Sequence, residues 1–229
     1  MSQAVQRQDW FAVGLEGVIV VAGVLIALAA NDWAAGRQAR RVEVESLRAL
    51  RAALSNDLGD IRGNLHNHTN ARDGAALLRE HIREGRPYSD TLDVYFAYLF
   101  TPSWSLRDLA AYETLKQRGM ETITSDSLRA EIGQLYGLTY EAALGAQELA
   151  YGLVMDQVAP YMDEHFRDHR LWQRWTPISY DEVASSPRFL SLLDRSNIIH
   201  GFLVAQLTRL EERTAALITD LDAEVARLE

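Results

Sequence analysis

Residues 10–30 read WFAVGLEGVIVVAGVLIALAA, a stretch with one charge, that of Glu16, and no proline. As an α-helix this stretch rises about 31 Å, which matches the hydrocarbon thickness of a bilayer. Aromatic side chains mark both of its ends, Trp10 and Phe11 on one side and Trp33 on the other, where such rings favour the membrane–water interface. The sequence therefore predicts one N-terminal transmembrane helix in contact with membrane lipid.

A cleaved signal peptide is the competing interpretation of the same residues. Such a peptide has a basic start, a shorter apolar core and a cleavage site of small residues. The start, MSQAVQRQD, is weakly basic, and Ala27, Ala29 and Ala30 resemble a cleavage site. The apolar run is long, however, and a helical pattern continues through Arg37. We therefore favour an uncleaved anchor that comprises residues 1–36.

Glu16 belongs to a stripe of mostly small residues along one face of this helix. Glu16, Val20, Gly23, Ala27 and Asn31 follow one another at intervals of 4, 3, 4 and 4. Small residues let a second helix approach closely, and a carboxylate inside a bilayer is unfavourable unless protein shelters it. The stripe predicts a homo-oligomer in which a protonated Glu16 bonds to a neighbouring helix or reaches towards the lipid headgroups. In the alternative, a ring of Glu16 side chains conducts protons or cations.

The composition of the chain as a whole is that of a folded protein. Hydrophobic residues make up 48% of the sequence and only five residues are proline, so wholesale disorder is excluded. The net charge of −9 argues against a nucleic-acid partner, since binding to phosphates depends on Lys and Arg. Without cysteine, the chain has no disulfide and no thiolate metal site.

Apolar periodicity beyond the anchor predicts an all-α fold, in which the transmembrane helix continues into a long helix and a helical-bundle domain follows. The domain spans residues 37–229, with a long helix over about 37–84, short helices within about 90–119, a long helix over about 125–169 and a C-terminal helix over about 187–229. No alternating pattern is long enough to predict a strand. Residues 170–187 are expected to form an ordered loop pinned by Trp172, Trp175 and Tyr180.

Local signals set several of these boundaries. Ser105 and Asp108 form a capping box for a short helix that ends at Gly119. Pro160 is expected to interrupt the helix that contains it. Pro187 begins the last helix as its first residue.

The first and last long helices each carry a leucine-rich seam with intervals of 3 and 4. The residues are Leu47, Leu50, Leu54, Leu58, Ile61 and Leu65 in the first, and Leu203, Leu207, Leu210, Thr214, Leu217 and Leu221 in the second. Such seams pack two helices together. The two helices either pack antiparallel within one bundle or form a coiled coil between subunits, and the sequence does not choose.

Two blocks of the sequence carry a family resemblance. Residues 23–28 read GVLIAL and are followed by Asn31, Trp33 and a charged amphipathic helix, and residues 112–119 read YETLKQRG. These blocks resemble the signature of an uncharacterised bacterial family of single-pass membrane proteins, classed as a domain of unknown function. The resemblance implies a location in the bacterial inner membrane and no known activity.

The side of the membrane that carries the domain is open. The resemblance implies a periplasmic domain. The arginines favour a cytoplasmic one, because Arg7 precedes the apolar stretch while Arg37, Arg40 and Arg41 follow it.

Residues that suggest chemistry are few. His165 and His169 are four apart on an expected helix and are flanked by acids, a spacing that suits a metal, but a charged, solvated helix end is the simpler interpretation. Phosphate-binding glycine motifs are missing. Six tyrosines, Tyr95, Tyr98, Tyr112, Tyr136, Tyr140 and Tyr151, have the spacing of core residues.

The chain is therefore interpreted as a membrane-anchored, homo-oligomeric helical protein. We expect no cofactor and no enzymatic activity. A scaffold, sensor or accessory role at the bacterial envelope follows, with another envelope protein as a possible partner.

Overall fold

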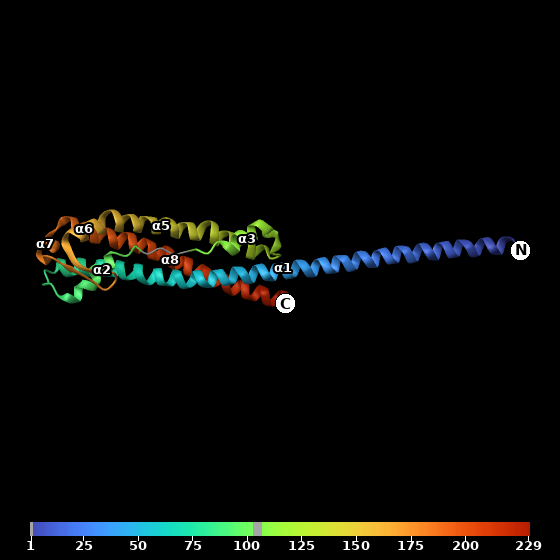
Figure 1. The fold of residues 1–229 in the computed structure, drawn as a ribbon, viewed down its shortest axis with the longest axis horizontal. Helices are drawn as coiled ribbons and strands as arrows, with labels where there is room; N and C mark the ends of the chain where they lie inside the picture. The colour runs from blue at the N-terminus through green and yellow to red at the C-terminus, as the bar shows by residue number, and fades with distance from the viewer. Residues whose placement is uncertain (1, 103–106) are drawn as a thin grey trace.

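One uninterrupted helix, α1 (Ser2–Arg83), forms the long axis of the molecule (Figure 1). The computed structural model describes residues 2–102 and 107–229, with side chains from residue 13 onward. The prediction of an all-α fold, in which an apolar N-terminal helix continues into a long helix and a helical domain, is confirmed. Gly36 does not interrupt the helix.

The two halves of α1 have different surroundings. Residues 13–41 are exposed along their whole length, and this part projects alone from the bundle (Figure 1). From Glu43 onward one face of the helix is buried in the domain. The apolar stretch is long enough to cross a membrane and packs against nothing in the part of the chain that the structure describes.

The second half of α1 pairs with the last helix, α8 (Pro187–Leu228), along its full length. Ion pairs join Arg79 to Asp194, Arg62 to Glu211 and Arg51 to Asp222, so the two helices run antiparallel. All seam residues of α8 are buried in this contact. The seam residues of α1 are buried as well, except Leu58 and Leu65, which are half-buried. Of the two arrangements open from the sequence, the seams take the one within a single chain.

A third long segment completes the bundle but is not one regular helix. It comprises α4 (Asp126–Gln134), the π-helical turn η3 (Leu135–Thr139), α5 (Tyr140–Leu153), the π-helical turn η4 (Val154–Val158) and α6 (Ala159–His165). The prediction of a helix as far as residue 169 is wrong, because the helix ends at His165. The helical path also continues through Pro160. The widened turn η4 precedes this proline, which has no N–H to donate to a regular turn.

Short elements connect the long ones. They are η1 (Asp90–Leu92), α2 (Asp93–Leu99), α3 (Ala110–Arg118), η2 (Met120–Thr122) and α7 (Tyr180–Ser185). Ser105 of the expected capping box lies outside the described residues, and the Asp108 carboxylate accepts a hydrogen bond from the Ala110 N–H at the start of α3 (3.0 Å). Gly119 ends α3 with a φ of 99°, as predicted, since glycine adopts this conformation without strain.

A β-hairpin occupies the region that was expected to be a helix end and a loop. Strands β1 (Phe166–Arg170) and β2 (Arg174–Pro177) pair antiparallel, with Phe166 opposite Pro177. The absence of strands in the prediction is therefore wrong. In β1 only Phe166 is buried, so its sequence FRDHR carries no alternating apolar signal. Of the three residues expected to pin this region, Trp175 is buried, Tyr180 is half-buried and Trp172 is exposed.

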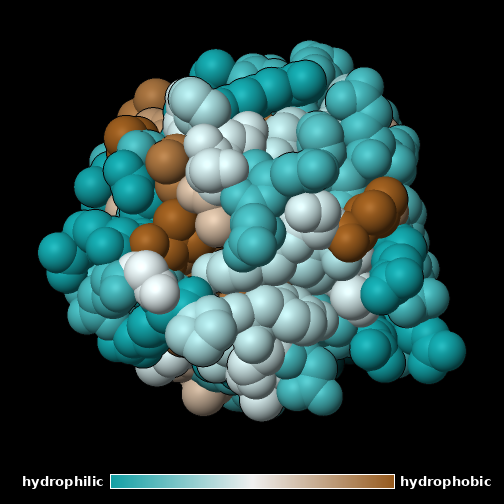
Figure 2. Space-filling view, turned by 90° about the vertical axis from the view of Figure 1, so that its left-hand side faces the viewer, coloured by the Kyte–Doolittle hydropathy of each residue, from teal (hydrophilic) through white to brown (hydrophobic). Residues whose placement is uncertain are grey.

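Two hydrophobic clusters fill the domain. The cluster nearer the projecting helix joins α1, α3, α4, α5 and the C-terminal half of α8. The distal cluster joins the end of α1, α2, α6, the hairpin and the start of α8. At the distal end, polar residues cover most of the surface and apolar residues form small separate groups (Figure 2). The core therefore consists of two clusters, and the distal cluster lies beneath a mostly polar surface.

Candidate membrane interface and buried polar layers

The predicted interface stripe lies on the free half of α1. Glu16, Val20, Gly23, Ala27 and Asn31 are all exposed. A Cβ atom placed on Gly23 would meet no atom within 4 Å. One face of the helix therefore offers small side chains and one carboxylate without any contact from the domain.

The predicted interface anchors flank the apolar stretch. Trp33 is 65% exposed, and the Arg37 guanidinium lies 4.7 Å from the centre of its ring. A cation over an aromatic face is a favourable contact. The side chains of Trp10 and Phe11, the other anchors, lie outside the described residues. The end of the apolar stretch nearer the domain thus combines an aromatic ring with a positive charge.

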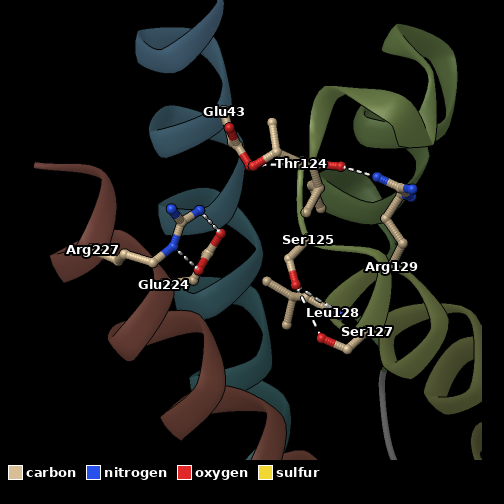
Figure 3. A network of polar contacts seen from close by, with 9 residues as sticks. Glu43, Thr124, Ser125, Ser127, Leu128, Arg129, Glu224 and Arg227 are labelled. Atoms are coloured by element: carbon tan, nitrogen blue, oxygen red, sulfur yellow. Dashed lines mark hydrogen bonds and ion pairs between the residues drawn. The ribbon is translucent and has the colours of Figure 1, made fainter.

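Where α1 enters the domain, a buried carboxylate fastens it to the start of α4 (Figure 3). Glu43 is 2% exposed, and its Oε1 accepts hydrogen bonds from the backbone N–H (2.6 Å) and the hydroxyl (2.8 Å) of Thr124. The next residue, Ser125, caps α4 by accepting from the Leu128 N–H (3.3 Å). The hydrogen bonds compensate for burying the carboxylate of Glu43.

Asp57, one-third of the way along the buried half of α1, makes a second polar layer. It is 2% exposed, and its carboxylate accepts hydrogen bonds from the Tyr140 hydroxyl (2.5 Å) and the Asp108 N–H (3.0 Å). Burial raises the pKa of Asp57, and these two hydrogen bonds oppose that rise. Burial and the neighbouring carboxylate raise the pKa of Tyr140. One carboxylate thereby joins α1, α5 and the segment before α3.

Tyrosine rings pack beside this layer. Tyr112 stacks on Tyr136 with ring centres 4.0 Å apart, and Tyr136 stacks on Tyr140 at 5.2 Å. The core packing predicted for the tyrosines is confirmed for Tyr136 and Tyr140, whereas Tyr151 is 40% exposed. The Tyr136 hydroxyl is buried without a hydrogen-bond partner among the described residues.

His68 and His200 form a third layer between the two hydrophobic clusters. Both are fully buried, and their Nδ1 atoms lie 3.0 Å apart, so one ring donates its proton and the other accepts it. Burial, followed by the proximity of His68, lowers the pKa of His200 to about 3. His200 is therefore neutral at ordinary pH, and the two rings form a buried contact between α1 and α8.

Asp93 makes the fourth layer, at the distal end. Its carboxylate is 3% exposed and accepts hydrogen bonds from Tyr88 (2.8 Å), Arg174 (3.1 Å) and Thr176 (2.6 Å). Burial, with the hydrogen bond to Asp93, raises the pKa of Tyr88 to about 12. This carboxylate attaches the hairpin to α2.

The histidines considered for metal binding have other contacts. His165 ends α6 and packs on Tyr161 with ring centres 4.3 Å apart. His169 lies on β1, stacks on Trp175 at 4.0 Å and contacts the Phe166 carbonyl oxygen (3.0 Å). The placement of both histidines on one helix is thus wrong. Within the described residues, no group of three or more potential ligands is arranged to hold a metal.

The sequence contains a signal for the buried polar layers that the predictions above do not include. Glu43, Asp57 and His68 continue the intervals of 3, 4 or 7 residues of the α1 seam, and His200 does so on α8. A charged residue on an apolar stripe indicates a buried polar contact. Its partner is invisible in the sequence because it comes from another element.

No protein-family model, curated protein or solved structure matches the chain. The resemblance of the two sequence blocks to a bacterial membrane family remains a prediction.

The two stacked tyrosines give a matched test of the Asp57 layer. Tyr140→Phe removes a donor from a buried carboxylate and is expected to lower the free energy of unfolding by about 1–3 kcal/mol. Tyr136→Phe removes an unpaired hydroxyl and is expected to be neutral or stabilising. Denaturant titration of the full chain in detergent measures both, and equal losses would contradict the assigned hydrogen bonding.

The histidine pair predicts a dependence of stability on pH. The unfolded chain binds a proton at His200 near the ordinary pKa of 6.5, whereas the folded chain does so only near about 3. The free energy of unfolding should therefore fall with decreasing pH, by up to about 1.4 kcal/mol per unit between about pH 6 and pH 4. Denaturant titrations at several pH values measure this slope.

The control is a histidine on the surface of the same helix. His200→Gln is expected to flatten the slope, whereas replacing the exposed His66 by Gln should leave it intact. Identical slopes in the two variants would assign the effect to other groups.

Proposed function

We propose that this chain is a membrane-anchored scaffold or accessory protein of the bacterial envelope that self-associates through the free half of α1. The observation that carries the proposal is a stripe of small residues around Glu16 that no other part of the described chain covers. An apolar helix of this length is stable in a bilayer. Small residues along one face are the usual basis of close helix packing there.

The packing of the domain supports this assignment, because it leaves only the N-terminal half of α1, among the helices that the structure describes, free to contact a second subunit through a helix seam. The seams of α1 and α8 are filled within one chain, so they offer no coiled coil to a second subunit. Self-association would therefore use the half of α1 that lies outside the bundle, through contacts between helices in the membrane.

The remaining parts of the proposal concern location and partners. The resemblance of the two sequence blocks supports the bacterial inner membrane and a periplasmic domain, whereas the arginines after the apolar stretch support a cytoplasmic one. The buried carboxylates have structural hydrogen-bond partners, which supports a role without catalysis. In an accessory role, the chain would bind another protein of the bacterial envelope.

Two glycines on opposite faces of α1 provide a matched test of self-association. Gly23→Leu places a bulky side chain on the stripe and is expected to shift the oligomer towards monomer. Gly14→Leu makes the same change nine residues away, about 180° around the helix, and is expected to leave the subunit number unchanged. Native mass spectrometry of the full chain in detergent measures both. A wild-type chain that is monomeric at every protein-to-detergent ratio would refute the proposal.

Ion or proton conduction is a second candidate, because Glu16 is the sole ionisable residue between Val13 and Ala30 and lies on the proposed interface. Conduction predicts that liposomes containing the wild-type chain show a flux of protons or cations that Glu16→Gln reduces at least tenfold. Empty liposomes serve as the control. Equal flux in wild type and variant removes this function and leaves the scaffold proposal untouched.

A further inference from the structure

Arginines gather on one face of α1 directly after the apolar stretch. Arg37, Arg40, Arg41 and Arg48 follow one another at intervals of 3, 1 and 7, which places them on the same side of the helix. With the end of α8 they line a hollow of about 380 Å³. A positively charged recess therefore lies between the apolar stretch and the body of the domain.

The charge of this recess is only partly neutralised within the chain. Glu45 and Glu229 also line it, and Glu229 forms an ion pair with Arg48. Arg40 and Arg41 are exposed and make no hydrogen bond or ion pair with the residues that the structure describes. This positive excess stands out in a chain whose net charge is −9.

The direction of the helix brings these guanidinium groups towards the bilayer. Ala30 ends the apolar run, and Arg41 lies about 16 Å further along the axis at 1.5 Å per residue. Side chains of an α-helix tilt towards its N-terminus, which here is the membrane side. Arg37 shows this tilt, since its guanidinium lies over the ring of Trp33, one turn closer to the apolar stretch. The edge of the recess at Arg37 lies about 10 Å past the apolar run, and arginine side chains that extend towards the N-terminus from there can reach the lipid headgroups.

We propose that this recess binds the headgroup of an anionic phospholipid. The planar guanidinium group of arginine forms paired hydrogen bonds with phosphate oxygens, and several arginines near a membrane surface favour anionic over neutral lipid. The ligand is membrane lipid rather than free phosphate, because the recess adjoins a helix that anchors in the bilayer. This binding requires insertion of α1 but not self-association.

The test uses the full-length chain, purified in a neutral detergent and titrated with phosphatidylglycerol or phosphatidylcholine. Native mass spectrometry counts the bound lipids and, in the same spectra, the subunits, so a failure of lipid binding is distinguished from a failure of assembly. The wild-type chain is expected to bind phosphatidylglycerol more tightly than phosphatidylcholine. Equal affinity for the two lipids would overturn the proposal.

A double substitution locates the site. Arg40→Gln with Arg41→Gln is expected to weaken phosphatidylglycerol binding about 20- to 30-fold, at about fivefold per arginine. The control, Arg195→Gln with Arg209→Gln, makes the same charge change at two exposed arginines of α8 within the domain and should bind as the wild type does. Unchanged binding in the first variant, or an equal loss in the control, would overturn the assignment.

A third arm separates lipid from free phosphate. Inorganic phosphate in large excess is expected to leave the bound phosphatidylglycerol in place, because the acyl chains add contacts with the apolar part of α1. Full displacement by inorganic phosphate would show that the recess recognises phosphate alone and would refute the lipid assignment.

Discussion

Burial of the leucine seam between α1 and α8 is the interaction on which the rest of the structure depends. Each leucine removed from water there contributes about 1.5–3 kcal/mol before entropy is counted, and the contact runs the length of the domain. Because α1 is one helix from the apolar stretch to Arg83, the same contact also holds the apolar stretch at a defined position relative to the domain. The long, thin shape of the molecule follows from this pairing (Figure 1).

The buried histidine pair gives this pairing a single register. A leucine seam alone tolerates a shift by one heptad, since leucine would again meet leucine. Such a shift would separate His68 of α1 from His200 of α8 and break the contact between their buried rings. Breaking a buried polar contact in this way is strongly unfavourable. The histidine pair therefore sets the register of α1 against α8, and Asp57 sets the position of α1 against α5 and the segment before α3.

The sequence predicts what depends on local period and misses what depends on partners. Long helices and their caps, such as Pro187 after Ser186, follow from spacing within one segment. The hairpin does not, because β2 is buried by α2, which lies far away in the sequence, and β1 is mostly exposed. The predicted helix therefore extended too far and included His169, which lies on β1. The partners of Asp57 could not be predicted, because its hydrogen-bond donors come from two other segments of the chain.

The contrast between the two halves of α1 supports the proposed self-association through the half that lies outside the domain. In the domain, each buried carboxylate has hydrogen-bond donors from another element of the same chain. Glu16 has no such donor from the domain, which begins to bury α1 only at Glu43. A carboxylate at mid-membrane costs about 2.5–3.5 kcal/mol, and less near an interface. A second copy of the stripe would supply both a polar partner for Glu16 and a closely packed surface, so the free energy of insertion itself favours association of the helices.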